Sequence, residues 1–187
     1  MQNGLDDSLL FPSRLLEELD WSQCSAQFKP AISATAPGDN LILRPLQASD
    51  YDTGFLQILG QLTSVGDVSR EMFQSRFDSM KACKDTYYIL VLEDICTSQV
   101  IGAASLIVEQ KFIHSAAMRG RVEDVVVSKD YRGKQLGKLL VQTLTLLAKH
   151  VGCYKVTLEC SDDNIKFYNN FGYEKSAENY MVARFKD

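Results

Sequence analysis

The sequence predicts an α/β (α+β) domain with a mixed central β-sheet flanked by helices, and two observations predict that class. In the second half of the chain, a valine-rich stretch at residues 122–127 precedes apolar residues at helical spacing up to His150, and a strand-like stretch follows at 155–160. This βαβ order makes the two strands parallel neighbours or nearly so. Earlier, residues 87–92 and 100–108 are strand-like and separated by a short turn region, which predicts an antiparallel pair.

The other elements are shorter and follow from caps, prolines and apolar spacing. Pro45 ends a strand that begins at residue 41, Ser69 caps a helix with an apolar face, and Gly152 ends the long helix. We also expect helices at residues 11–19, 49–62 and 164–171, and a last strand at residues 180–185. Residues 1–40 are expected to form an N-terminal arm, and residues 41–187 the domain itself.

Composition limits the classes of function. With 187 residues, the chain has room for one domain with a core. A net charge of -4 argues against nucleic acid as a partner, which normally requires a basic face. We expect neither an integral membrane segment nor a signal peptide, and therefore a cytoplasmic protein, with peripheral association with endomembranes left open. Five cysteines without a C-x-x-C pair argue against a disulfide framework or zinc site, and no metal is expected.

A loop rich in glycine and basic residues lies between the valine-rich strand and the long helix. Its residues are Arg132, Gly133, Lys134, Gln135, Leu136, Gly137 and Lys138. At such a junction, unpaired backbone N–H groups and the positive end of the helix dipole converge, which favours binding of an anion such as a pyrophosphate. The loop matches neither the nucleotide P-loop nor the Rossmann fingerprint, and a simple tight turn is the alternative reading.

Three blocks follow one another in the sequence: Glu123-Asp124-Val125-Val126-Val127, the loop from Arg132 to Gly137, and Asn164-x-x-Phe167-Tyr168-x-x-Phe171-Gly172-Tyr173. This order resembles the GNAT superfamily of acetyl-CoA-dependent N-acetyltransferases, whose usual loop is [QR]-x-x-G-x-[GA]. Gln135 departs from that pattern at the first glycine position. Longer blocks, at residues 111–114, 120–127, 132–140 and 153–160, are similar to the glucosamine 6-phosphate N-acetyltransferase branch, and the resemblance extends from about Leu10 onward.

The resemblance implies a GNAT acyltransferase fold around a βαβ core, with acetyl-CoA as co-substrate and glucosamine 6-phosphate as acceptor, on the route to UDP-N-acetylglucosamine. It also implies a homodimer that exchanges its last strand, so that active sites are shared. The implied cofactor-binding positions are Val125, Val126, Val127, Arg132, Gly133, Lys134, Gln135, Leu136, Gly137, Lys138, Asn164 and Tyr168. The implied sugar phosphate positions are Thr63, Lys111, His114, Glu123, Asp124, Thr157, Leu158 and Arg184, the last of which would act in the partner's site.

The chemistry of amide formation singles out three side chains. An amine attacks a thioester only when it is unprotonated, so the site needs a proton acceptor, and Glu123 and Glu159 are the candidates, directly or through water. Glu123 and Asp124 are adjacent, so in a regular strand at most one of them faces the amine. Tyr168 can protonate the departing thiolate, because a phenol has a pKa of about 10. No covalent intermediate is required, and we predict direct transfer.

Two other functions are compatible with this pattern. A protein or polyamine N-acetyltransferase of the same fold would favour an acidic acceptor groove rather than a cluster of Lys111, His114 and Arg184. A non-catalytic acyl-CoA-binding module would have a damaged acid–base set, whereas Tyr168 and both glutamates are present. The same residues also have structural readings, since Tyr168 can be a core aromatic residue and the glutamates can be ion-pair partners.

Overall fold

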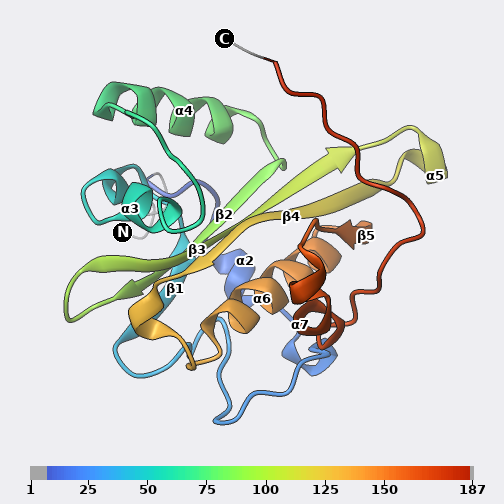
Figure 1. The fold of residues 1–187 in the computed structure, drawn as a ribbon, viewed down its shortest axis with the longest axis horizontal. Helices are drawn as coiled ribbons and strands as arrows, with labels where there is room; N and C mark the ends of the chain where they lie inside the picture. Colours follow the sequence, from blue (N-terminus) through green and yellow to red (C-terminus); the bar gives the residue numbers. More distant parts are fainter. Residues whose placement is uncertain (1–7, 186–187) are drawn as a thin grey trace.

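A five-stranded sheet forms the centre of the protein, in the order β1-β2-β3-β4-β5 (Figure 1). The computed structural model describes residues 8–185. The first four strands pair antiparallel and β5 pairs parallel to β4, which confirms the mixed sheet and both predicted pairings. The strands are β1 (Leu41–Pro45), β2 (Tyr87–Asp94), β3 (Gln99–Gln110), β4 (Met118–Val127) and β5 (Cys153–Thr157).

Helices and short 3-10 turns surround this sheet. They are α2 (Arg14–Glu17), η1 (Trp21–Gln23), η2 (Ala48–Tyr51), α3 (Phe55–Leu59), α4 (Arg70–Ala82), α5 (Ile113–Ala116), η3 (Lys129–Tyr131), α6 (Leu136–His150), η4 (Asp162–Asn164) and α7 (Ile165–Asn169). Helix α6 packs across β3, β4 and β5, while α3 packs on β3 and β4. Residues 88–92 of β2 are all buried, so both faces of the sheet are covered there.

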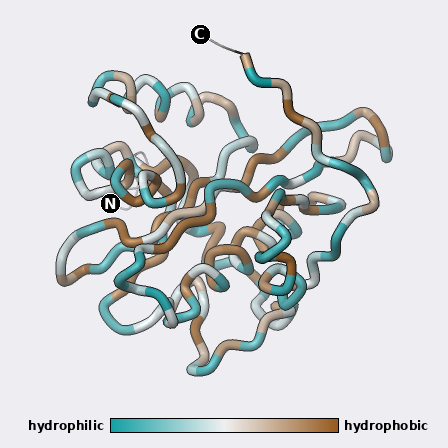
Figure 2. The backbone as a smooth tube through the Cα atoms, viewed as in Figure 1, coloured by the Kyte–Doolittle hydropathy of each residue, from teal (hydrophilic) through white to brown (hydrophobic). Residues whose placement is uncertain are grey.

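Hydrophobic burial explains why these elements form. Ten of the fifteen residues of α6 are buried, and the backbone turns out of the helix at Gly152, whose φ of 92° is easy for glycine alone. Figure 2 shows hydrophobic stretches running through the central strands and α6. Arm residues belong to the same core, because Leu10, Phe11 and Leu16 are each less than 7% exposed and lie in the main cluster.

Strand β4 contains a bulge that changes which side chains share a face. Val122 lies opposite Leu106 and Val127 lies opposite Gly102, so β4 carries one residue more than β3 between these pairs. The extra residue falls at Asp124, whose φ is 53°. Val122 and Val127 therefore share one face of the sheet, although a regular strand would put them on opposite faces.

The same strand separates from its parallel neighbour. β5 pairs with β4 only along Met118 to Arg121, so within residues 8–185 the edge of β4 that faces β5 has no strand partner from Val122 to Val127. The two strands thus diverge at their carboxyl ends. Unpaired backbone groups at such an edge can receive an added strand-like ligand.

Several expected elements differ in the structure. The helix expected at residues 11–19 is only the four-residue α2, and the one expected at 164–171 is divided between η4 and α7. The helix expected at residues 49–62 is η2 followed by α3, because Gly54 has a φ of 96° and interrupts it. The strand expected at 155–160 begins and ends earlier, as β5. The last strand expected at 180–185 is wrong for the single chain: these residues form no strand and are exposed, since no neighbouring strand offers them hydrogen bonds.

Candidate functional site

The diverging ends of β4 and β5 open into a groove of about 540 Å³, called here the β4 groove. Val125 and Val127 line it from the unpaired part of β4, and Asn164, Phe167 and Tyr168 line it from η4 and α7. The loop from Arg132 to Lys138 closes one end, apart from Lys134. The side chain of Val126 is buried in the core. The groove therefore joins, in one place, most of the predicted cofactor positions.

The loop presents the start of a long helix to this groove. Leu136 is the first residue of α6, and Gln135 before it has a left-handed backbone with φ of 62°. Gly133 also has a positive φ, of 83°. Gln135 thus adopts a backbone conformation that favours glycine, the residue usual at this position in the superfamily pattern. The first N–H groups of α6 have no helical partner, so they are available to an anion.

The basic side chains of the loop are not equally placed. The Lys134 ammonium lies 5.0 Å from the centre of the Tyr131 ring. Lys138 donates a hydrogen bond to the backbone oxygen of Gln27 and lies 4.8 Å from the centre of the Phe28 ring. Arg132 is exposed. The arm thus holds one of the cations that the sequence places at the anion site.

Both candidate proton acceptors contact one arginine. Arg121 Nε lies 2.5 Å from Glu123 Oε1, and Arg121 Nη2 donates to Glu159 Oε2 at 3.1 Å. Burial raises the pKa of Glu123 above its usual value, and the negative charges of Asp124 and Glu159 raise it further, against the lowering effect of Arg121. A raised pKa makes a carboxylate a stronger proton acceptor. The sequence analysis missed Arg121, although its spacing of two from Glu123 on a strand puts both on one face.

We expected the side chains of Glu123 and Asp124 to point to opposite faces of the sheet, as in a regular strand. Because of the bulge, the strand is not regular at these two residues. Glu123 lies opposite Ser105, before the extra residue, and its side chain is 30% exposed. Asp124 is exposed and lies in the bulge itself. Alternation alone therefore does not decide which of the two side chains approaches a ligand.

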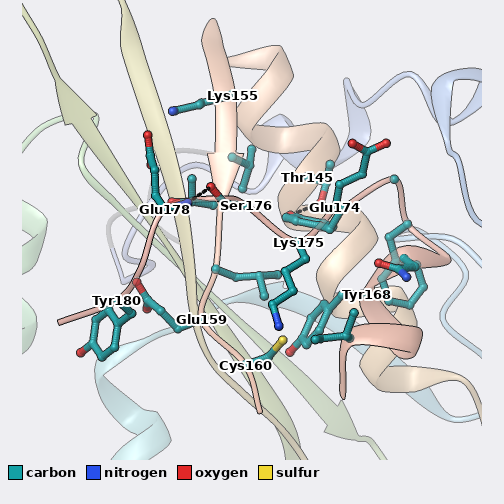
Figure 3. Close-up of a pocket in the computed structure, with 18 of the residues that line it drawn as sticks. Thr145, Lys155, Glu159, Cys160, Tyr168, Glu174, Lys175, Ser176, Glu178 and Tyr180 are labelled. Carbon is teal, nitrogen blue, oxygen red and sulfur yellow. Dashed lines mark hydrogen bonds between the residues drawn. The ribbon is translucent and has the colours of Figure 1, made fainter. Parts of the chain in front are cut away.

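Tyr168 lies between the β4 groove and a second cavity, called here the tyrosine cavity, which Thr157, Leu158 and Glu159 also line. Figure 3 shows the Tyr168 hydroxyl and the Cys160 sulfur pointing toward one another. Burial, and secondarily Cys160, raise the pKa of Tyr168. The phenol is therefore protonated at neutral pH and can act as a proton donor. Residues 174–176 and 178–180 of the tail form the outer wall of this cavity (Figure 3).

The predicted sugar phosphate positions are only partly brought together. Lys111 pairs with Glu109, which also accepts from Arg119 at 2.7 Å. The His114 ring packs on Tyr154 at 4.8 Å between centres, inside α5. His114, Ser115 and Ala116 all have φ near 55–60°, a costly backbone for such residues. Among residues 8–185, neither Thr63 nor Arg184 forms a hydrogen bond or ion pair with these side chains, and both are exposed.

No three His, Cys, Asp or Glu side chains in residues 8–185 are grouped so that they could hold a metal ion. Over the same residues, no helix has the length and hydrophobicity needed to cross a membrane.

Known proteins similar to this chain share its fold and much of its sequence. The profile of the acetyltransferase (GNAT) family matches residues 54–173. The probable glucosamine 6-phosphate N-acetyltransferase of Drosophila melanogaster is 53% identical over 90% of this chain and 77% of its own length. Glucosamine 6-phosphate N-acetyltransferase 1 of Dictyostelium discoideum is 39% identical over 73% of this chain and 87% of its own. The crystal structure of the Arabidopsis thaliana glucosamine-6-phosphate N-acetyltransferase superposes with a TM-score of 0.74 at 37% identity, over 80% of this chain and 100% of that one.

Proposed function

The chain belongs to the acetyltransferase (GNAT) family, and we propose that it transfers the acetyl group of acetyl-CoA to the amine of glucosamine 6-phosphate. The observation that carries the proposal is the unpaired edge of β4 opening onto a groove closed by the loop before α6. Such a groove suits an extended thioester with an anionic end. The names of the relatives, at up to 53% identity, supply the acceptor.

The cofactor binds as an additional strand in this proposal. The pantetheine arm pairs with the backbone of Val125 and Val127, while Val126 anchors the strand through its buried side chain. The pyrophosphate binds at the N–H groups that begin α6, beside Arg132 and Lys134. Asn164 contacts the cofactor from the opposite wall of the groove.

Transfer is direct, within a ternary complex of enzyme, acetyl-CoA and sugar phosphate. The amine nitrogen attacks the thioester carbonyl carbon, and a backbone N–H of β4 stabilises the oxyanion that forms. The proton released by the amine passes to Glu123 or Glu159, directly or through water, and Arg121 keeps these carboxylates in place. When the carbon–sulfur bond breaks, Tyr168 donates its proton to the CoA thiolate. The products are the N-acetylated sugar phosphate and CoA.

Lys111, together with Arg184 from a partner protomer, provides the cationic end for the sugar phosphate, and His114 lies in the same acceptor site. Glu109, near the end of β3, pairs with the ammonium of Lys111, which follows that strand. Asp124, Thr157 and Leu158 border the acceptor near the reacting amine, and Thr63 binds it from the segment after α3. An acidic groove for a polyamine or a lysine side chain would lack this basic cluster.

The C-terminal tail supports a homodimer with shared sites. Tyr180, Met181, Val182 and Phe185 are between 52% and 93% exposed, a run of hydrophobic side chains that a second copy can cover by strand exchange. The product enters UDP-N-acetylglucosamine biosynthesis in the cytoplasm.

The test is release of free CoA thiol from acetyl-CoA by purified protein, with three acceptors in parallel. Fast release with glucosamine 6-phosphate, and slow release with glucosamine and with a lysine peptide, is the expected result. Release with the peptide alone would overturn the acceptor but not the transferase activity. Tight CoA binding without release for any acceptor would favour a non-catalytic acyl-CoA-binding module.

A further inference from the structure

The arm segment, residues 24–29, lies against the elements that form the β4 groove, far from it in sequence (Figure 1). Two independent sets of contacts join them. One set is polar and reaches the loop before α6. The other is hydrophobic and reaches β4, α6 and α7 from behind the groove.

The polar contacts centre on Gln135. Its side-chain nitrogen donates to the Lys29 backbone oxygen at 2.8 Å, and its side-chain oxygen accepts from the Lys29 backbone nitrogen at 3.3 Å. Both polar atoms of the Gln135 side-chain amide thus form hydrogen bonds with the backbone of the same arm residue, Lys29. Lys138, one turn into α6, donates to Gln27 and lies over the Phe28 ring.

The hydrophobic contacts form a small core of their own. Ala26 is buried with Val141 of α6 and Phe171, just after α7. Cys24 and Phe28 of the arm segment pack against the same cluster, as do Val125, Tyr168 and Tyr173. Ser25 adds a hydrogen bond of 3.1 Å to the buried side chain of Gln142. Val125 and Tyr168, which line the groove, thus pack against the same cluster as the arm segment.

The backbone of Gln135 explains why this contact matters. Its φ of 62° is unfavourable for a residue with a side chain. A glycine would adopt that angle freely, yet the glutamine amide is what reaches Lys29. The two hydrogen bonds offset the strain and fix the angle at which the first N–H groups of α6 open into the groove.

We propose that the arm segment, docked through Gln135, is a positioning element of the acetyl-CoA site. It holds two parts of the β4 groove in the geometry that binds the cofactor: the anion-binding loop, and the side chains of Val125 and Tyr168. No residue of the arm from Ser8 to Asn40 lines the β4 groove, so this part of the arm acts through these residues rather than by touching the cofactor. Cofactor binding and arm docking stabilise each other, since thermodynamic linkage is reciprocal. The inference rests on the proposed CoA site.

The test uses one variant on each side of the contact. Gln135→Gly removes the amide and leaves a residue suited to the local φ. Ala26→Glu displaces the arm from its hydrophobic cluster without changing the loop. Gln74→Ala, which removes a hydrogen bond to Asp78 on the surface of α4, and Ala82→Glu at the exposed end of α4 are the matched controls.

Calorimetric titration of the full-length proteins with CoA gives the affinity. We expect the Kd to rise about three- to tenfold in each of the first two variants, from the loss of one or two exposed hydrogen bonds and of arm ordering. The double variant should lose no more than either single one, because both changes undock the same segment. The KM for acetyl-CoA should rise in parallel, while kcat and the KM for the sugar phosphate stay within about twofold of their original values.

Hydrogen exchange of residues 24–34 provides a readout independent of activity. CoA should slow exchange there in the unmodified protein and in both controls, and not in Gln135→Gly or Ala26→Glu. A loss of affinity in Gln135→Gly but not in Ala26→Glu would mean that loop flexibility alone is responsible and would overturn the proposal. Unchanged affinity in both variants would also overturn it, whereas an unmodified protein that binds no CoA would refute the proposed function itself.

Discussion

The two ends of the chain differ in how far their hydrophobic side chains are buried. The arm buries Leu10, Phe11 and Leu16 in the core of its own chain. The tail leaves Met181 and Phe185 about nine-tenths exposed, and its residues up to Phe185 form no helix or strand. Both ends lie outside the matched family region, residues 54–173. The arm thus belongs to the core of its own chain, whereas the tail exposes hydrophobic side chains that the proposed partner protomer can cover.

Tyr168 packs against the hydrophobic cluster that contains Ala26 of the arm, and it also lines the tyrosine cavity, whose outer wall is the tail. We expect its replacement to have the largest effect on activity. Tyr168→Phe keeps the ring but removes the proton donor, so we expect kcat to fall by about 10²–10⁴-fold with CoA affinity nearly unchanged. Steady-state kinetics and calorimetry measure the two quantities. If affinity and activity disappear together, Tyr168 is a packing residue of the arm cluster and not an acid.

Arg184→Ala tests whether the tail serves another protomer. Loss of a cation paired with the sugar phosphate should lower kcat/KM by about 30- to 1,000-fold, mainly through the KM for the sugar phosphate. Mixing this variant with Tyr168→Phe should restore part of the activity, because mixed dimers contain one site with both residues intact. An active monomer in sedimentation, or no recovery on mixing, would contradict shared sites.

Leu16→Ala in the arm and Met181→Ala in the tail compare how much each end of the chain contributes to the stability of the fold. Leu16 is 4% exposed, so its truncation leaves a cavity, and we expect a loss of about 2–5 kcal/mol in the free energy of unfolding. Met181→Ala should change the unfolding free energy of a protomer by less than about 0.5 kcal/mol, and weaken association instead. Denaturant unfolding at several protein concentrations separates the two effects. If both variants lowered the unfolding free energy of a monomer equally, the proposed difference between a buried arm and an exposed tail would be wrong.

Glu123→Gln tests the raised pKa of the carboxyl group at this position. A carboxyl group whose pKa is higher in the folded protein than in the unfolded chain stabilises the fold when protonated, and this contribution is lost as pH rises through the folded pKa. The neutral variant should therefore have a slightly higher Tm than the unmodified protein at pH 7, and the gap should close below about pH 4.5. Activity should fall as pH is lowered through the pKa of the base. A variant that is less stable at pH 7 would show that the pair with Arg121 dominates.

The smallest effect is expected from Cys160→Ser. The Cys160 thiol points toward Tyr168 in the tyrosine cavity, but direct transfer does not involve it (Figure 3). We expect kcat/KM to stay within about threefold of its original value, with no acyl-enzyme in mass spectra of the protein incubated with acetyl-CoA alone. A large loss of activity together with an acetylated Cys160 in the unmodified protein would replace direct transfer by a two-step route.

The sequence was sufficient for those features that depend on local pattern. The βαβ unit, the antiparallel β2–β3 pair and the glycine-rich loop follow from periodicity and turn residues, and the structure confirms the pairings. Arg121 was missed because a charged residue in a strand is usually solvated, and only the position of Glu159 in space reveals its second contact. The strand expected near residue 180 has the composition of a strand, but a strand forms only beside a partner.

The bulge at Asp124 also lacks a sequence signature. Asp is less common than glycine at positive φ, and nothing adjacent to it indicates an extra residue. The docking of residues 24–29 on the loop before α6 depends on contacts more than a hundred residues apart along the chain. Such features become visible only when the whole fold brings the segments together.

The bulge has a consequence for how β4 can change during evolution. The one additional residue determines which face of the sheet each later side chain of β4 lies on. Deleting a single residue near Asp124 would therefore move Val125, Val126 and Val127 each to the opposite face. Substitutions at these positions alter only the residue concerned, whereas a change in length reverses the whole end of the strand. We therefore expect this strand to vary in composition across related proteins but to keep its number of residues.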